Sequence, residues 1–142
     1  MKKKYLVTGG SGFIGSALVK GLLREGHSVR VFDNNSRGNL RRLESVIDQI
    51  EFVEGDIREP NQVLEACKGV DAVCHLAFVN GTKFFYELPE LVLEVGVKGM
   101  INILDACIAH NIEDLILASS SEVYQSPAEV PTSENVPLIV PD

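Results

Sequence analysis

Apolar and polar positions along this chain change between two periods. Residues 4–9 (KYLVTG) form a short apolar run that ends in glycine, and residues 27–33 (HSVRVFD) alternate with period two, as strands do. Between them, residues 13–25 carry apolar side chains at helical spacing, and Gly26 stops the helix. The chain therefore opens with a strand, a helix and a second strand.

The same change of period continues through the rest of the chain. It predicts further strands at residues 50–56, 71–77 and 114–120, and helices at residues 39–48, 60–67 and 87–110. The last and longest helix has one apolar face, made of Leu88, Leu91, Val92, Val95, Gly99, Ile103, Leu104 and Cys107. Strands and helices in alternation favour parallel strands joined by right-handed crossovers. The expected fold is α/β, an open doubly wound parallel sheet of about five strands.

Composition limits the class of protein. The 142 residues suit one domain, which we place at residues 1–125, and the proline-rich residues 126–142 read as a connecting loop. A net charge of −7 argues against binding to nucleic acid, and no apolar run approaches membrane-spanning length. The odd number of cysteines, without a C-x-x-C pair, predicts buried thiols in a reducing cytoplasm rather than disulfides or a zinc site.

Glycines are regularly spaced where the first strand meets the first helix. Gly10-x-Gly12-x-x-Gly15 matches the dinucleotide fingerprint, and Gly9-x-x-Gly12-x-x-Gly15 matches its overlapping variant. The motif follows a strand, opens a helix and lies in a βαβ unit, which is the context that the fingerprint requires. Its glycines allow a tight turn, close approach to a pyrophosphate and packing of helix on strand, and the helix N-terminus faces the phosphates.

An acidic residue, Asp33, ends the second strand 18 positions after Gly15. A carboxylate there accepts hydrogen bonds from both hydroxyls of the adenosine ribose, and its charge repels a 2′-phosphate. This favours NAD over NADP as the cofactor. Arg37 lies close behind and is able to accommodate the 2′-phosphate of NADP. The alternative is a glycine turn of purely structural use.

Five motifs in chain order resemble the extended short-chain dehydrogenase/reductases, in particular the NAD-dependent epimerase/dehydratase group that acts on nucleotide sugars. They are TGGSGFIGSALV (residues 8–19), DNNSRG (33–38), EGDI (54–57), HLA (75–77) and SSSEVY (119–124). The resemblance spans the whole chain. It implies a Rossmann domain that binds NAD.

The resemblance assigns cofactor contacts to each motif. Phosphate and ribose contacts are implied for Gly9, Gly12, Phe13, Ile14, Gly15, Asp33, Asn34, Asn35, Ser36, Arg37 and Gly38. The adenine amine would meet Asp56 and its ring would be covered by Ile57, while Leu76, Ala77, Phe78 and Ser119 would lie at the nicotinamide half. Asp56 also has a plain alternative role as a turn residue after a strand.

The fifth motif carries the expected catalytic residues. Ser120 matches the family's catalytic serine or threonine, whose role is a hydrogen bond to the reacting sugar oxygen. Glu122 matches the acid/base glutamate of several dehydratases and decarboxylases, and Ser121 at the adjacent acid position weakens a dehydratase interpretation. The alternatives are a serine-rich strand end that satisfies loop amides and a solvated charge. His75 is either a base or metal ligand, or, as we favour, a buried hydrogen-bonded histidine.

Some family features differ or are missing. Gly96 stands where the family often has an asparagine, and Gln125 replaces the usual glycine after Tyr124. The Tyr-x-x-x-Lys pair that the family uses as its base is not found, because Tyr124 is followed four places later by Ala128 and the last lysine is Lys98. The chain therefore resembles the amino-terminal portion of a longer enzyme, and one face of its sheet is expected to lack a helix and to expose apolar surface.

Two functions remain open at this point. The first is the NAD-binding portion of a nucleotide-sugar epimerase or dehydratase, inactive by itself, whose parent moves a hydride between a sugar carbon and NAD through a keto intermediate. The second is a standalone dinucleotide-binding or redox-sensing module without catalysis. Under the first, the expected partners are NAD, a nucleotide sugar in the full-length parent, and a second copy of the chain through helix 87–110.

Overall fold

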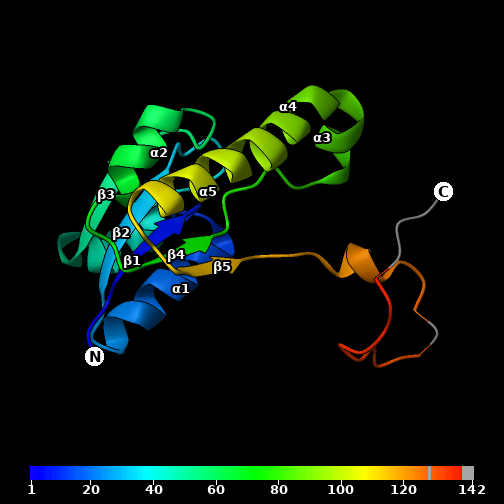
Figure 1. Ribbon diagram of the computed structural model, residues 1–142, viewed down its shortest axis with the longest axis horizontal. Helices are drawn as coiled ribbons and strands as arrows, with labels where there is room; N and C mark the ends of the chain where they lie inside the picture. The colour runs from blue at the N-terminus through cyan, green and yellow to red at the C-terminus, as the bar shows by residue number, and fades with distance from the viewer. Residues whose placement is uncertain (128, 139–142) are drawn as a thin grey trace.

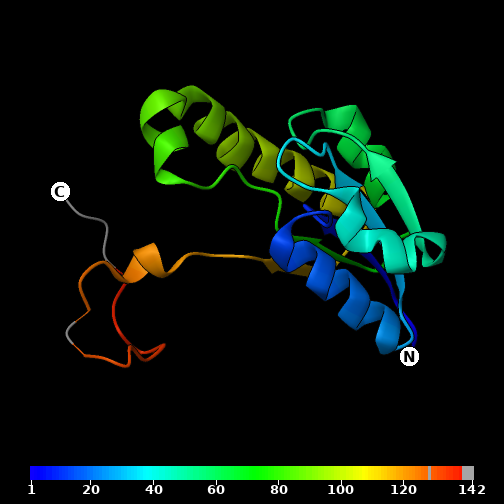
Figure 2. The same ribbon diagram turned by 180° about the vertical axis from the view of Figure 1, so that it is seen from behind.

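The computed structural model describes residues 1–127 and 129–138, and its central feature is a parallel five-stranded sheet with helices on both faces (Figures 1 and 2). The strand order is β3-β2-β1-β4-β5, so the chain turns from one half of the sheet to the other between β3 and β4. The α/β doubly wound prediction is confirmed. The carboxyl ends of β1, β2, β3 and β4 meet at one edge, where such sheets bind ligands.

The strands are short and the helices lie between them in the predicted order. The strands are β1 (Lys4–Thr8), β2 (Ser28–Asp33), β3 (Ile50–Glu54), β4 (Ala72–His75) and β5 (Asp114–Leu117). The helices are α1 (Phe13–Arg24), η1 (Leu40–Gln49), α2 (Pro60–Cys67), α3 (Thr82–Glu87), α4 (Pro89–Leu93), η2 (Glu94–Lys98), α5 (Gly99–Ala109) and η3 (Ser121–Tyr124). The segments η1 and η3 are 3₁₀ helices and η2 is a π-helical turn.

Each face of the sheet has its own buried core. Neighbouring strand residues point to opposite faces, so Val7 packs with Val19 and Leu43 under α1 and η1. Leu6 instead joins Ile103 in the cluster under α2 and α5. The three cysteines are buried free thiols, as predicted. Burial raises the pKa of the Cys67 thiol to about 12.

The prediction of one helix over residues 87–110 needs two corrections. The helical run begins at Pro89, and residues 82–87 form the separate helix α3. Leu88 breaks the run, with φ −137° and ψ 55°, because proline disfavours helical geometry in the residue before it. Leu88 and Leu104, expected on the buried face, are 48% and 41% exposed. The other residues predicted on the buried face of α5, Gly99, Ile103 and Cys107, are buried.

The edge strand β5 is covered on one face only. Leu115 packs against the α2 and α5 side, whereas Ile116, which points to the opposite face, is 59% exposed. Leu117, the last residue of the strand, points to the same face as Leu115 and is 52% exposed. The sequence predicted exposed apolar surface on the sheet, and this surface is present on β5, the edge strand next to β4. The predicted domain limit at residue 125 and the loop 126–142 remain expectations, and residues 128 and 139–142 of that loop lie outside the described residues. None of the helices in the described ranges is long and apolar enough to cross a membrane.

Candidate functional site

The glycine turn, residues 9–15, connects β1 to α1 at the carboxyl edge of the sheet. Gly9 has φ +70°, a conformation that favours glycine, and its carbonyl accepts the Gly12 N–H at 3.1 Å. A Cβ atom on Gly15 would lie 2.2 Å from the Gly9 carbonyl oxygen, so that position has no room for any side chain. The turn thus brings the start of α1 directly against the end of β1.

The N-terminus of α1 carries no acidic residue or side-chain cap. Gly12 is the N-cap residue, and the first turn of this 12-residue helix contains no Asp or Glu. Phe13 and Ile14, the first two residues of the helix, are 84% and 69% exposed. The first N–H groups of a helix lack internal acceptors and carry partial positive charge. This end of α1 therefore fits the phosphates of a dinucleotide.

Asp33, only 8% exposed, holds the glycine turn to the ribose loop, residues 33–38. One carboxylate oxygen accepts the Ser11 N–H at 2.9 Å, and the other accepts the Asn35 N–H at 2.9 Å. Each oxygen keeps lone-pair capacity for a further donor, such as a ribose hydroxyl. Asp33 therefore lies beside the glycine turn, and its contact with a ribose stays a prediction.

Ser11 is a site residue that the sequence analysis missed. It is fully buried, its Oγ donates to Asn35 Oδ1 at 3.0 Å, and its carbonyl accepts the Asn39 N–H at 3.0 Å. A Cβ on Gly38 would lie 1.7 Å from Ser11 Oγ, so the glycine at position 38 lets the ribose loop close over Ser11. Ser11 occupies the unspecified position of the motif, so spacing gave no signal for it.

Arg37 contacts the segment that follows β4. Its guanidinium donates to the Asn80 carbonyl and lies 5.1 Å from the centre of the Phe84 ring. In the described structure Arg37 therefore joins the loops that follow β2 and β4. Ser36 and Asn34 form a local turn in which the Ser36 N–H donates to Asn34 Oδ1 at 3.0 Å.

The adenine loop, residues 55–59, lies between β3 and α2. Asp56 is not only a turn residue, because its carboxylate accepts donors from both Arg58 and Asn34. The Arg58 guanidinium and these hydrogen bonds, partly opposed by burial, lower the pKa of Asp56 to about 2. Ile57 is 5% exposed and packs in the core. A cover for an adenine ring would therefore come from the edge of Ile57 that reaches the surface.

His75, at the end of β4, is a structural residue. Thr8 Oγ1 lies 2.7 Å from His75 Nδ1 and accepts the N–H groups of Leu76 and Ala77, each at 3.2 Å. The Thr8 hydroxyl therefore ties the His75 ring to the start of the segment that follows β4. Burial lowers the pKa of His75 to about 4, so the ring is neutral. We therefore retain the buried-histidine interpretation, and the described part of the chain contains no cluster of metal-binding side chains.

The Phe78 ring lies against the glycine at position 96. A Cβ on Gly96 would lie 2.9 Å from Cε2 of this ring, so a larger residue at position 96 requires the ring to move. Phe78 is 47% exposed and lies near Phe85, with ring centres 6.5 Å apart. The side of the site that follows β4 is therefore aromatic.

The predicted catalytic residues lie apart from this site. Ser119, Ser120 and Glu122 are exposed, and the serine segment, residues 118–125, runs out beyond the layers of the sheet (Figure 1). Ser120 Oγ accepts the Glu122 N–H at 3.3 Å and caps η3. The structure brings together the glycine turn, the ribose loop, the adenine loop and the end of β4. It does not bring the serine segment to them.

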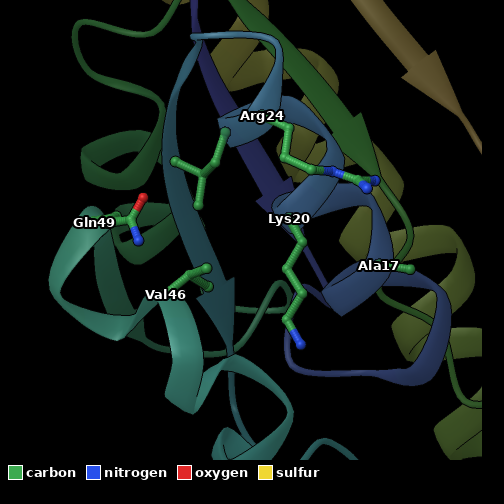
Figure 3. Close-up of a pocket in the computed structure, with 6 residues that line it drawn as sticks. Ala17, Lys20, Arg24, Val46 and Gln49 are labelled. Carbon is green, nitrogen blue, oxygen red and sulfur yellow. The ribbon is translucent and has the colours of Figure 1, made fainter.

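A surface groove of about 530 Å³ lies elsewhere, between α1 and η1 (Figure 3). Its lining residues are Ala17, Lys20, Leu23, Arg24, Val46 and Gln49. Arg24 ends α1 and Gln49 directly precedes β3, so the groove extends to the amino edge of the strands. Ligands of doubly wound sheets bind at the opposite edge, so we do not assign the cofactor to this groove.

A doubly wound sheet whose first turn is GxGxxG, with an acidic residue ending the second strand, defines a dinucleotide-binding α/β domain. The model of the NAD dependent epimerase/dehydratase family matches residues 5–141. The chain belongs to this family. The predicted family and its cofactor class, NAD, are confirmed.

The relatives are nucleotide-sugar enzymes. The chain is 37% identical over 124 residues to a UDP-N-acetyl-alpha-D-glucosaminuronate decarboxylase of Bacillus cytotoxicus, covering 87% of this chain and 38% of that protein. It is 33% identical to a UDP-glucose 4-epimerase of Corynebacterium glutamicum, covering 94% of this chain and 40% of the relative. The chain thus spans about two fifths of the length of these curated relatives.

Solved structures have the same fold. A UDP-glucose 4-epimerase of Thermus thermophilus in complex with NAD superposes with a TM-score of 0.86 at 34% identity, over 96% of this chain and 44% of that one. An epimerase of Stenotrophomonas maltophila with bound NAD and formylated UDP-arabinopyranose gives a TM-score of 0.90 at 26% identity, over 96% and 43%.

Proposed function

We propose that this chain is the NAD-binding portion of a nucleotide-sugar epimerase or dehydratase. The observation that carries the proposal is the contact of Asp33 with the Ser11 N–H, because it joins the glycine turn to the residue that would accept the ribose hydroxyls. The proposed partner is NAD, with a nucleotide sugar bound only by the full-length parent. The charge of −7 supports a small-molecule partner over nucleic acid, and we place the protein in the cytoplasm.

The proposed reaction needs more than this binding site. NAD, when bound, supplies the hydride acceptor and donor for the sugar carbon. We assign Ser120 to a hydrogen bond with the reacting sugar oxygen and Glu122 to proton transfer. Both side chains are exposed, with Ser120 as the N-cap residue of η3 and Glu122 within it, and no Tyr-x-x-x-Lys pair is found in the sequence. We therefore expect the 142-residue chain to bind NAD without turning over a sugar.

The alternative is a dinucleotide-binding or redox-sensing module without catalysis. The same cofactor contacts support it, so the two proposals differ in turnover and in the response to the redox state. A sensor is expected to bind NAD and NADH with different affinity and to change conformation between them. The NAD-binding portion of an enzyme is expected to bind both with its structure unchanged.

We also propose that two copies of the chain associate through the helical run 89–109. Its outer side carries an apolar stripe, with Leu93, Val97, Ile101, Leu104 and Ile108 between 41% and 75% exposed. An apolar face of this length is typical of a helix that packs against a partner. Ile108→Glu is expected to lower the dimer fraction in sedimentation analysis. A wild-type chain that stays monomeric at high concentration would contradict the proposal.

Calorimetric titration with NAD tests the central proposal. We expect saturable one-to-one binding by the wild-type chain and no epimerisation when a UDP-sugar is added. The absence of NAD binding at millimolar concentration would refute the retained cofactor site. Turnover of a UDP-sugar by the isolated chain would instead refute the requirement for a Tyr-x-x-x-Lys pair.

A further inference from the structure

We infer that Arg58 is a positioning residue that makes the adenine end of the site selective for a purine with a 6-amino group. The inference rests on the proposed NAD-binding function. Arg58 lies in the adenine loop, between the end of β3 at Glu54 and the start of α2 at Pro60. Its side chain is not expected to contact the base, because it acts on the carboxylate of Asp56.

Arg58 holds both oxygens of that carboxylate. The Arg58 backbone N–H and Nε donate to Asp56 Oδ1 at 2.9 and 3.0 Å, and Nη2 donates to Oδ2 at 2.8 Å. The side chains of Arg58 and Asp56 are 31% and 20% exposed. A guanidinium that donates to both oxygens fixes the plane of a carboxylate, which a single point charge does not. The orientation of the Asp56 carboxylate is therefore set by Arg58.

Arg58 is itself attached to the helical run. Its Nη1 donates to Glu94 Oε2 at 3.1 Å, in the first residue of the π turn η2. Asn102 Nδ2 donates to the Ile57 carbonyl at 2.8 Å, and a Cβ on Gly99 would lie 2.4 Å from Ile57 Cδ1. The adenine loop is thus held from η2 and α5 at three points, so the carboxylate has a defined place relative to the sheet as well as a defined plane.

One donor on Asp56 remains exchangeable. Asn34 Nδ2 donates to Oδ2 at 3.1 Å, which is longer than the three contacts from Arg58 and comes from a neutral, exposed residue of the ribose loop. An incoming amine therefore displaces the Asn34 amide at the least cost, while Arg58 keeps its contacts. The 6-amino group of adenine donates to a carboxylate, whereas the 6-oxo group of hypoxanthine offers an acceptor that the carboxylate repels.

The test compares NAD with nicotinamide hypoxanthine dinucleotide, which differs from NAD only in the base. Dissociation constants for both are measured by calorimetry on the wild-type chain and on Arg58→Gln. We expect the wild type to prefer NAD by about 10-fold, because the adenine amine replaces the Asn34 hydrogen bond whereas the carboxylate repels the 6-oxo group. In Arg58→Gln the ratio is expected to fall to about threefold or less, mainly through weaker NAD binding.

Two further variants distinguish the positioning of the Asp56 carboxylate by Arg58 from a general effect of losing a positive charge. Arg24→Gln removes the same charge at the end of α1 and is expected to keep the wild-type ratio. Arg58→Lys keeps the charge without the planar fork, and its ratio is expected to fall at least about threefold below wild type. This variant serves as the test if Arg58→Gln does not fold.

The outcomes distinguish the inference from the proposed function. A wild-type chain that binds neither dinucleotide contradicts the proposed function. A wild-type chain that binds both equally, or an Arg58 variant that keeps the full preference for NAD, overturns the inference and leaves NAD binding in place. A uniform loss of affinity for both dinucleotides also overturns it, because a merely structural role lowers both alike.

Discussion

The glycine turn and the serine segment follow two strands of the same sheet, yet their environments differ. In the turn, Ser11 is fully buried and its backbone is bonded to the ribose loop through Asp33. In the serine segment, Ser120 is exposed and its hydroxyl contacts only the next turn of its own chain, at 3.3 Å, within the described residues. β1 is flanked by β2 and β4, whereas β5 is an edge strand. The glycine turn follows a central strand, so the loops after neighbouring strands contact it and hold it in place. The serine segment follows an edge strand and lacks such contacts on that side in the part of the chain that the structure describes.

The largest expected effect comes from filling the glycine turn. Gly15→Ala places a Cβ 2.2 Å from the Gly9 carbonyl oxygen, so α1 must move away from β1. We expect NAD binding to weaken about 100-fold, or about 2.7 kcal/mol, in calorimetric titration. Gly21→Ala on the same helix, where the nearest atom is 4.0 Å away in a flexible side chain, is the control and is expected to bind normally. Normal NAD affinity in Gly15→Ala would contradict the comparison, because the close packing of the glycine turn would then not matter for NAD binding.

Removing the carboxylate between turn and loop should have the next largest effect. Asp33→Ala leaves the Ser11 and Asn35 N–H groups without their acceptor. The expected costs are about 1–3 kcal/mol in the free energy of unfolding and about 10- to 100-fold in NAD affinity. Urea unfolding and calorimetry measure the two. If Asp33→Ala changes neither, the turn does not depend on its neighbouring loop and the contrast with the serine segment fails.

A fall in pH should lower the free energy of unfolding through protonation of Asp56 in the adenine loop. Its pKa of about 2 lies below the ordinary value of 3.8, so the ionised form stabilises the fold above that value, and the stabilisation is lost as the pH falls toward 2. With allowance for solvent screening, this amounts to up to about 1 kcal/mol between pH 6 and pH 3. Arg58→Gln should lose less stability than the wild type over this interval in urea unfolding. Equal losses would show that Arg58 does not hold the charge of Asp56.

The smallest effect is expected from replacing a serine by alanine in the serine segment, compared with the same replacement in the glycine turn. Ser120→Ala removes one exposed contact, and we expect changes within about 0.5 kcal/mol in unfolding free energy and about twofold in NAD affinity. Ser11→Ala removes the buried bond to Asn35 and should cost about 1 kcal/mol or more. Thermal unfolding and calorimetry on the pair sharpen the comparison. A Ser120 variant that loses as much as the Ser11 variant would contradict it.

Much of the fold was predictable because periodicity reports burial. The strand at residues 50–56 and the helix at 60–67 appear as Ile50–Glu54 and Pro60–Cys67. The helix predicted over 87–110 failed at its start, since the pattern of apolar residues continued through Leu88 although Pro89 cannot follow a helical residue easily. The pattern of apolar residues gave no signal for the π turn η2. A π turn widens the helix by one residue, and this does not require a particular type of residue.

Only part of the candidate site could be predicted from the sequence. Glycine spacing indicated Gly15 and the end of the second strand indicated Asp33, whereas Asp56 came from the resemblance to the family. The contacts of these residues with a cofactor stay predictions. Ser11 and Arg58 were missed, since their roles come from contacts with the ribose loop and with the helical run. Contacts of this kind between separate elements leave no local pattern.

The sequence by itself determined the order of strands and helices, the glycine turn and the family. Periodicity and glycine spacing are local properties of the chain, and each has a local physical cause in burial or in backbone room. The tertiary structure decided that His75 is a neutral partner of Thr8, that Phe78 takes the space beside Gly96, and that Arg58 joins Asp56 to Glu94. These depend on side chains from distant segments meeting at one edge of the sheet, and only the packing of the elements brings them there.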